Sequence, residues 1–156
     1  MHKLASYGAL LALIAFAAVA QAPRPARGGL QLSSTLEPVA AKAADGDDAP
    51  PAGAEFVLSV EFTNTSEHVL DAVRITSPVP RHLRYVVDSA SGPGSEAMFS
   101  VDEGQTFGQP ADLTIVGADG RARAAEAAEY THVRFVLDAP LDAGATGIAR
   151  FRVVSR

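Results

Sequence analysis

The sequence predicts an all-β fold, a two-sheet sandwich of about seven to eight short strands, and two observations support this prediction. The first is alternation: apolar residues occupy every second position from Phe56 to Phe62, and side chains in a strand point to opposite faces with a period of two. The second is the placement of turns: segments rich in glycine and proline separate the apolar runs along the chain. No long amphipathic helical pattern competes with this reading.

The first 22 residues are expected to be a cleaved signal peptide. Lys3 supplies a positive charge, residues 4–19 are apolar and rich in alanine, and A-x-A cleavage patterns end at Ala20 and Ala22. An uncleaved anchor stays open as the alternative, since about 18 apolar residues can nearly span a bilayer. Residues 23–29 follow as a linker, and residues 30–156 are expected to form a single domain in the periplasm or outside the cell.

The chain has 156 residues, no cysteine and a net charge of −5. An exported domain without disulfides must be stabilised by burial alone, and a mature chain of about 134 residues can bury enough surface for that. The acidic balance argues against nucleic acid as a partner. After signal cleavage no stable membrane span is expected, and a bacterial envelope or extracellular protein fits these features best.

A first strand is expected over residues 30–36, followed by a loop over residues 37–53. The acidic cluster Asp45-Gly46-Asp47-Asp48 in this loop raises the question of calcium, which binds carboxylate oxygens. The cluster lacks the twelve-residue spacing and the closing glutamate of a calcium loop, so a solvated loop is favoured over a metal site.

Turns and corners divide the next three strands. Residues 64–67 end the second strand with turn-forming side chains. The third strand resumes at Val73 and must end at Pro78 and Pro80, because proline cannot donate to a β-ladder. The fourth is expected to continue the alternation through Tyr85 to Val87.

The residues at these corners resemble a known family. Asn64-Thr65-Ser66, Val73-Arg74-Ile75-Thr76, the Pro78-to-Tyr85 stretch and Leu141-Asp142-Ala143-Gly144 are similar to motifs of the bacterial surface-repeat domain of unknown function number eleven. The resemblance covers about residues 53–154, with Ser66 in place of the family's glycine and Ser77 in place of its aspartate. It implies an immunoglobulin-like sandwich on exported proteins and no known catalytic activity.

Residues 100–107 match the Asp-box pattern, S-x-D-x-G-x-T followed by an aromatic residue. Asp102 can accept backbone N–H bonds across the turn, Gly104 can adopt positive φ, and Phe107 can plug the base of the hairpin. Asp boxes are familiar from sialidase-like propellers, but a propeller needs several blades of about 40–50 residues each. No second box is present, so a structural hairpin is expected.

Further strands are expected over residues 98–101, 113–116, 133–137 and 148–154, with a turn at Pro140 and Gly144 before the last. Residues 121–129 are rich in alanine and glutamate and are expected to form a turn or two of helix. Arg134, Arg150 and Arg152 are expected on one outward sheet face, either as a patch for an acidic partner or, preferably, as a solvated face.

The sequence contains no nucleophile elbow and no phosphate-binding glycine loop. The three histidines that follow the expected signal peptide, His68, His82 and His132, are not spaced in the sequence as metal ligands are. We therefore expect a non-enzymatic module, without cofactor or metal, that binds or spaces another envelope protein or itself. Contacts are expected at loops 64–68, 89–96 and 117–129 or at an edge strand. Two alternatives stay open: a carbohydrate-active or other hydrolase using loop carboxylates, and a surface-polymer subunit in which residues 30–36 swap between copies.

Overall fold

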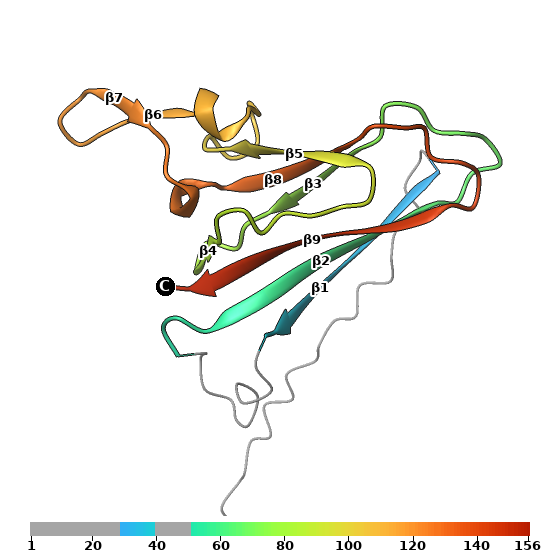
Figure 1. Ribbon diagram of the computed structural model, residues 1–156, viewed down its shortest axis with the longest axis horizontal. Helices are drawn as coiled ribbons and strands as arrows, with labels where there is room; N and C mark the ends of the chain where they lie inside the picture. Colours follow the sequence, from blue (N-terminus) through green and yellow to red (C-terminus); the bar gives the residue numbers. More distant parts are fainter. Residues whose placement is uncertain (1–28, 40–50) are drawn as a thin grey trace, which may run out of the picture.

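The structure is a computed structural model that describes residues 29–39 and 51–156. Two antiparallel sheets form its body, and Figure 1 shows them as two layers. The first sheet has the order β1 (Leu30–Pro38), β2 (Glu55–Asn64), β9 (Thr146–Ser155) and β4 (Leu83–Tyr85). The second has the order β3 (Arg74–Pro78), β8 (His132–Leu137) and β5 (Ser95–Ser100). The prediction of an all-β fold is confirmed.

The strands form because their apolar alternation buries one face of each sheet. The buried members of the core belong to both sheets and form a single cluster. Each buried Val, Leu or Phe side chain stabilises the fold by about 1.5–3 kcal/mol relative to exposure, and this burial takes the place of disulfides. The largest fully buried apolar side chains are Val60, Ile75, Leu83, Val133, Phe135, Phe151 and Val153.

A separate hairpin extends from the end of the second sheet (Figure 1). It pairs β6 (Thr114–Val116) with β7 (Ala122–Ala124) across a turn in which the Gly117 N–H donates to the Arg121 carbonyl at 2.8 Å. The prediction of helix over residues 121–129 is therefore wrong for its first half. Pairing in this hairpin overrides the helix propensity of alanine, as tertiary context often does. Only a single 3₁₀ turn, Ala127–Glu129, follows.

Three other expectations are wrong for reasons of tertiary structure. Val87 does not continue the fourth strand: β4 ends at Tyr85, Asp88 adopts a φ of +55°, and Val87 is 62% exposed. Arg134 does not share a face with Arg150 and Arg152, because β8 and β9 belong to different sheets. Strand β5 also begins at Ser95, inside the stretch expected to be a loop.

Candidate functional site: loop ends, a polar cleft and a sheet edge

The turn residues singled out in the sequence gather at the two ends of the sheets (Figure 1). Asn64, Thr65 and Gly144 meet at one end, where the Gly144 N–H donates to the Asn64 carbonyl at 2.9 Å. Pro78 and Pro80 lie at the other end beside the Asp-box hairpin. The connection there runs through Thr131, whose carbonyl accepts from Val79 N–H at 2.8 Å and whose hydroxyl accepts from Glu103 N–H at 3.1 Å.

Asn64 is fully buried, and its side chain closes the first of these ends. Its amide nitrogen lies 2.7 Å from the His68 carbonyl, 2.9 Å from the Leu141 carbonyl and 3.1 Å from the Asp142 carbonyl. Its amide oxygen accepts from the backbone N–H and the hydroxyl of Ser66. Asn64 thus joins two of the family-like motifs that are far apart in the sequence, and every polar atom of its side chain is engaged within the protein.

Asp102 organises the hairpin at the second end. Its carboxylate accepts from the Ser100 hydroxyl at 2.7 Å, from the Thr106 N–H at 2.9 Å and from the Thr106 hydroxyl at 2.6 Å. Gly104 adopts a φ of +84°, a conformation that glycine takes without steric cost. The hydroxyl of Thr106, followed by its N–H and the Ser100 hydroxyl, holds the pKa of the Asp102 carboxyl well below its usual range.

Phe107 does not fill the base of the Asp-box hairpin as expected. Its half-buried ring is not among the core residues, and the Arg134 guanidinium lies 3.5 Å above the ring centroid. Arg134 also donates through Nε to the Thr76 hydroxyl at 2.9 Å. The end of the Asp-box pattern is therefore attached to the outward face of the second sheet by a cation–π contact.

We expect Asp102→Asn to destabilise the protein at neutral pH, because an amide cannot accept all the bonds that the carboxylate receives. A carboxyl whose pKa is lowered by folding stabilises the fold above its unfolded pKa of about 3.8 and loses that contribution as the pH falls further. Urea unfolding measures the free energy of unfolding of wild type and of Asp102→Asn. The difference between these two free energies should therefore narrow below about pH 3.8. Glu103→Gln, at an exposed position, is the matched control and should change the free energy of unfolding little. If the loss of unfolding free energy in Asp102→Asn did not depend on pH, this assignment would be contradicted.

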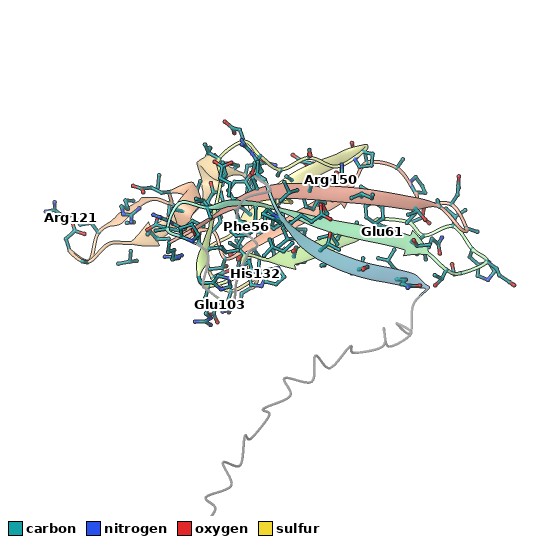
Figure 2. The ribbon with its side chains drawn as sticks, turned by 90° about the horizontal axis from the view of Figure 1, so that it is seen from below. Phe56, Glu61, Glu103, Arg121, His132 and Arg150 are labelled. Atoms are coloured by element: carbon teal, nitrogen blue, oxygen red, sulfur yellow. The ribbon has the colours of Figure 1, made fainter. Side chains whose placement is uncertain are left out.

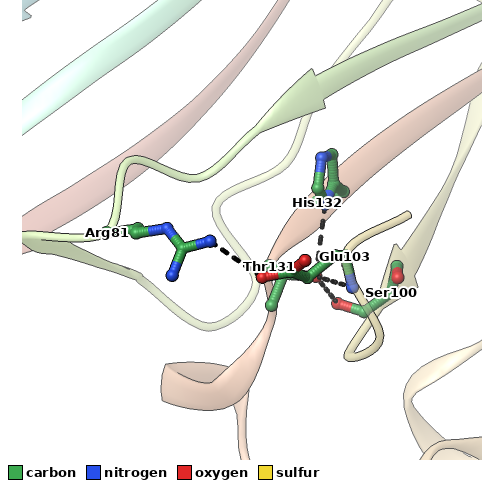
Figure 3. Close-up of polar contacts among 5 residues, drawn as sticks. All are labelled: Arg81, Ser100, Glu103, Thr131 and His132. Carbon is green, nitrogen blue, oxygen red and sulfur yellow. Dashed lines mark hydrogen bonds and ion pairs between the residues drawn. The ribbon is translucent and has the colours of Figure 1, made fainter. Parts of the chain in front are cut away.

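A cleft of about 630 Å³ lies between the proline corner and this hairpin. Figure 3 shows the polar contacts at its side: Arg81 pairs with Glu103 at 2.9 Å, and Thr131 contacts His132 Nδ1 at 3.2 Å. The Arg81–Glu103 pair is exposed and contributes at most about 1 kcal/mol. The lining residues are Pro78, Val79, Pro80, Arg81, Leu83, Glu103, Glu129, Tyr130, Thr131, His132 and Arg156.

Two polar side chains that line this cleft, Thr131 and Glu129, are bonded to other groups of the protein. The Thr131 hydroxyl donates to the Ser100 carbonyl at 3.1 Å, so its proton is directed away from the His132 ring. Glu129 is bonded to Arg123 at 2.5 Å, and this contact lowers the pKa of the Glu129 carboxyl. A general acid of a glycosidase needs the opposite shift. Thr131 and Glu129 therefore act as structural groups that hold the hairpin and the 3₁₀ turn.

The second candidate surface is the edge strand β1. Leu32 and Leu36 are 45% and 44% exposed, although they lie on the core-facing side of the sheet. Their side is fixed by register, because Leu32 pairs with Phe62 and Leu36 with Leu58, and both of these partners are buried. Figure 2 shows β1 at the outer margin of its sheet, beside Glu61 of β2. The second sheet does not cover this strand.

The backbone of β1 is also open on its outer side. Val39 N–H donates to the Glu55 carbonyl, and the Gly29 carbonyl accepts from Thr65 N–H. Bonded and non-bonded pairs alternate in an antiparallel ladder, so the odd-numbered residues bond to β2 and the even-numbered residues direct their N–H and C=O groups outward. Within the described residues β1 pairs only with β2. Pro38 is even-numbered, so its missing N–H falls on the open edge, where proline is tolerated.

The remaining expectations concern metal binding, membrane crossing and segments outside the described residues. In residues 29–39 and 51–156, no cluster of three or more His, Asp or Glu side chains has metal-binding geometry. None of the helices described is long and apolar enough to cross a membrane. The expected signal peptide and the acidic cluster Asp45–Asp48 lie outside the described residues.

The chain was compared with models of protein families, with curated proteins and with solved structures, and nothing matched in any of the three comparisons. The similarity to the surface-repeat domain therefore rests on the turn and strand motifs quoted above. Within the described residues, the open edge of β1 and the cleft at the Asp-box hairpin are two surfaces that the geometry offers for a function.

Proposed function

We propose that this is an exported, non-enzymatic protein of the bacterial envelope or surface, a single immunoglobulin-like module that binds another protein chain at the edge of β1. The observation behind this proposal is the exposure of Leu32 and Leu36 beside an unpaired strand backbone. An extended segment added to such an edge gains main-chain hydrogen bonds and pockets for alternate side chains.

The composition of β1 favours this use of the edge. Natural proteins protect exposed edges with lysine, proline, bulges or very short strands. β1 is nine residues long, has Glu37 as its single charged side chain, and carries its proline at the last position. An edge that is long and carries only one charged side chain, with its proline at the end, is suited to a partner strand and is an aggregation hazard without one.

The immunoglobulin-like assignment has support in the four-and-three division of the strands, which parallels the constant-type domain. The chain path departs from that domain, because the last strand, β9, lies between β2 and β4, whereas the last immunoglobulin strand lies at a sheet edge. The apolar N-terminal stretch with its A-x-A patterns supports export. The family resemblance supports a surface location without catalysis.

The test is site-specific photocrosslinking in the cells that produce the protein, with the photoreactive residue at position 34 or at position 84. Ser34 is at the centre of β1, and the exposed Arg84 is at the centre of β4, the opposite edge of the same sheet. We expect one adduct of defined mass from position 34 and none from position 84. Equal labelling from both positions, or adducts from position 84 alone, would refute β1 as the binding edge.

A further inference from the structure

We propose that the partner at this edge is a second copy of the same chain, paired through antiparallel β1 strands about a twofold axis at Ser34. The inference rests on the proposed function, since it identifies the occupant of the same edge. A twofold interface is isologous: the same surface of both copies forms it, so that if one residue contacts another, the reverse contact is also made. The strand must therefore be complementary to itself when reversed.

The sequence of β1 meets this requirement. With Ser34 opposite Ser34 of the second copy, Leu32 lies opposite Leu36 and Ser33 lies opposite Thr35. Gln31 then lies opposite Glu37, so the charge of each β1 strand faces an amide and the two Glu37 carboxylates stay apart. Leu30 lies opposite Pro38, so each apolar residue of the nine-residue strand meets an apolar residue and each polar residue meets a polar one. Directly opposed side chains are the pairs that stabilise a sheet.

The backbone phase agrees with the same register. The axis at Ser34 pairs even-numbered residues with even-numbered residues, and these are the residues whose N–H and C=O groups point away from β2. Only the Pro38 donor is missing, at the two ends of the joint ladder. A shift of the register by one residue would place the apolar face of one copy beside the polar face of the other. The open hydrogen-bonding groups and the apolar face therefore both require even-numbered residues to pair with even-numbered residues.

The joined sheets would also cover the exposed leucines. Leu32 and Leu36 of each copy lie on the core-facing side, where each second sheet ends before β1. In the joint sheet these side chains become neighbours of Leu36 and Leu32 of the second copy. An apolar strip that is half exposed in one chain is thereby buried between two.

The other sheet edges are less suited to this role. β4 has three residues, and β3 ends at Pro78 with the Thr76 hydroxyl already bonded to Arg134. The outer side of β5 is occupied within its own chain, because Phe99 and Gly108 exchange backbone hydrogen bonds at 2.9 and 3.0 Å. Among the described strands, β1 combines length, open backbone and uncovered apolar side chains.

The test uses charge at the proposed axis. In Ser34→Lys or Ser34→Glu, like charges oppose each other across the twofold axis, which destabilises the pair. We expect wild type to be dimeric in light scattering coupled to size-exclusion chromatography. Each variant should have a dimer dissociation constant raised at least about tenfold, because like charges juxtaposed at an interface are strongly unfavourable. An equimolar mixture of the two variants should restore the dimer, because the introduced lysine of one chain faces the introduced glutamate of the other only in the heterodimer.

Arg84→Glu on the opposite edge is the matched control and should leave the dimer unchanged. Circular dichroism shows whether the Ser34 variants fold, which the exposure of this side chain leads us to expect. A monomeric wild type at every concentration, or a mixture no more dimeric than its components, would overturn self-pairing. A crosslink from position 34 to a different protein would also overturn self-pairing, but it would leave the proposed binding function of the β1 edge standing. A crosslink from position 34 to residues 23–28 of the same chain would overturn both self-pairing and the proposed function.

Discussion

Asn64→Ala is expected to lower the free energy of unfolding by about 3 kcal/mol or more, because it removes five hydrogen bonds of a fully buried side chain and each such bond contributes about 0.5–1.5 kcal/mol. The substitution removes the donor to three carbonyls and the acceptor for Ser66 at once. Urea unfolding monitored by circular dichroism measures the effect. The loss should appear as a lower midpoint with an unchanged slope, since the fold itself is retained.

Thr65→Ala is the matched control in the same turn. Its hydroxyl is exposed and donates to the Gly29 carbonyl at 3.0 Å, so its removal is expected to cost no more than about 1 kcal/mol. Asn64→Asp keeps an acceptor for Ser66 but directs a carboxylate at three carbonyls, so it should be at least as harmful as alanine at neutral pH. If Asn64→Ala and Thr65→Ala lowered the free energy of unfolding by equal amounts, the structural role assigned to Asn64 would be contradicted.

The position of Asn64 in a turn is predictable from sequence, but its partners are not. Turn-forming residues after an alternating strand indicate a corner because their preference is local. The bonds to Leu141 and Asp142 span 77 and 78 residues, and no local pattern specifies such a pairing. The family-like Leu141–Gly144 motif indicates another turn; only the fold brings the two turns together.

The errors in the strand predictions have a common physical cause. Periodicity predicts a strand where one face is buried, and it succeeds for β2, β8 and β9. The predicted strand does not reach Val87, because the backbone turns at Asp88. The predicted helix does not form at Ala122–Ala124, because pairing with β6 outweighs the local helix preference. Arg134 is assigned to the wrong sheet, because alternation gives a side of a strand and says nothing about which sheet the strand joins.

The same limit applies to the candidate site. Alternating leucines in residues 30–36 predict a strand, but the exposure of Leu32 and Leu36 depends on how far the opposite sheet extends. The cleft likewise depends on the meeting of the proline corner, the Asp-box hairpin and Thr131, which come from separate parts of the chain. Sequence specifies these components locally, whereas the surfaces they make are products of tertiary structure.

Tyr85→Ala is expected to be the second strongly destabilising change, by about 3–5 kcal/mol, as for other large aromatic side chains removed from a core. Tyr85 is 4% exposed, and its ring centroid lies 5.1 Å from that of Phe99, 5.6 Å from that of Tyr130 and 6.0 Å from that of Phe151. Phe99 belongs to the second sheet and Phe151 to the first. The ring therefore joins the short strand β4 to both layers.

Tyr85→Phe separates the ring from the hydroxyl. The hydroxyl accepts from Ala90 N–H at 3.1 Å, so its loss alone should cost about 1 kcal/mol. Val87→Ala, at an exposed position two residues further on, should stay within about 0.5 kcal/mol of wild type. If Tyr85→Phe proved as costly as Tyr85→Ala in urea unfolding, the hydrogen bond would hold β4 in place. A cost confined to Tyr85→Ala would instead show that aromatic packing between the sheets fixes β4, because three residues of ladder are too few to do so.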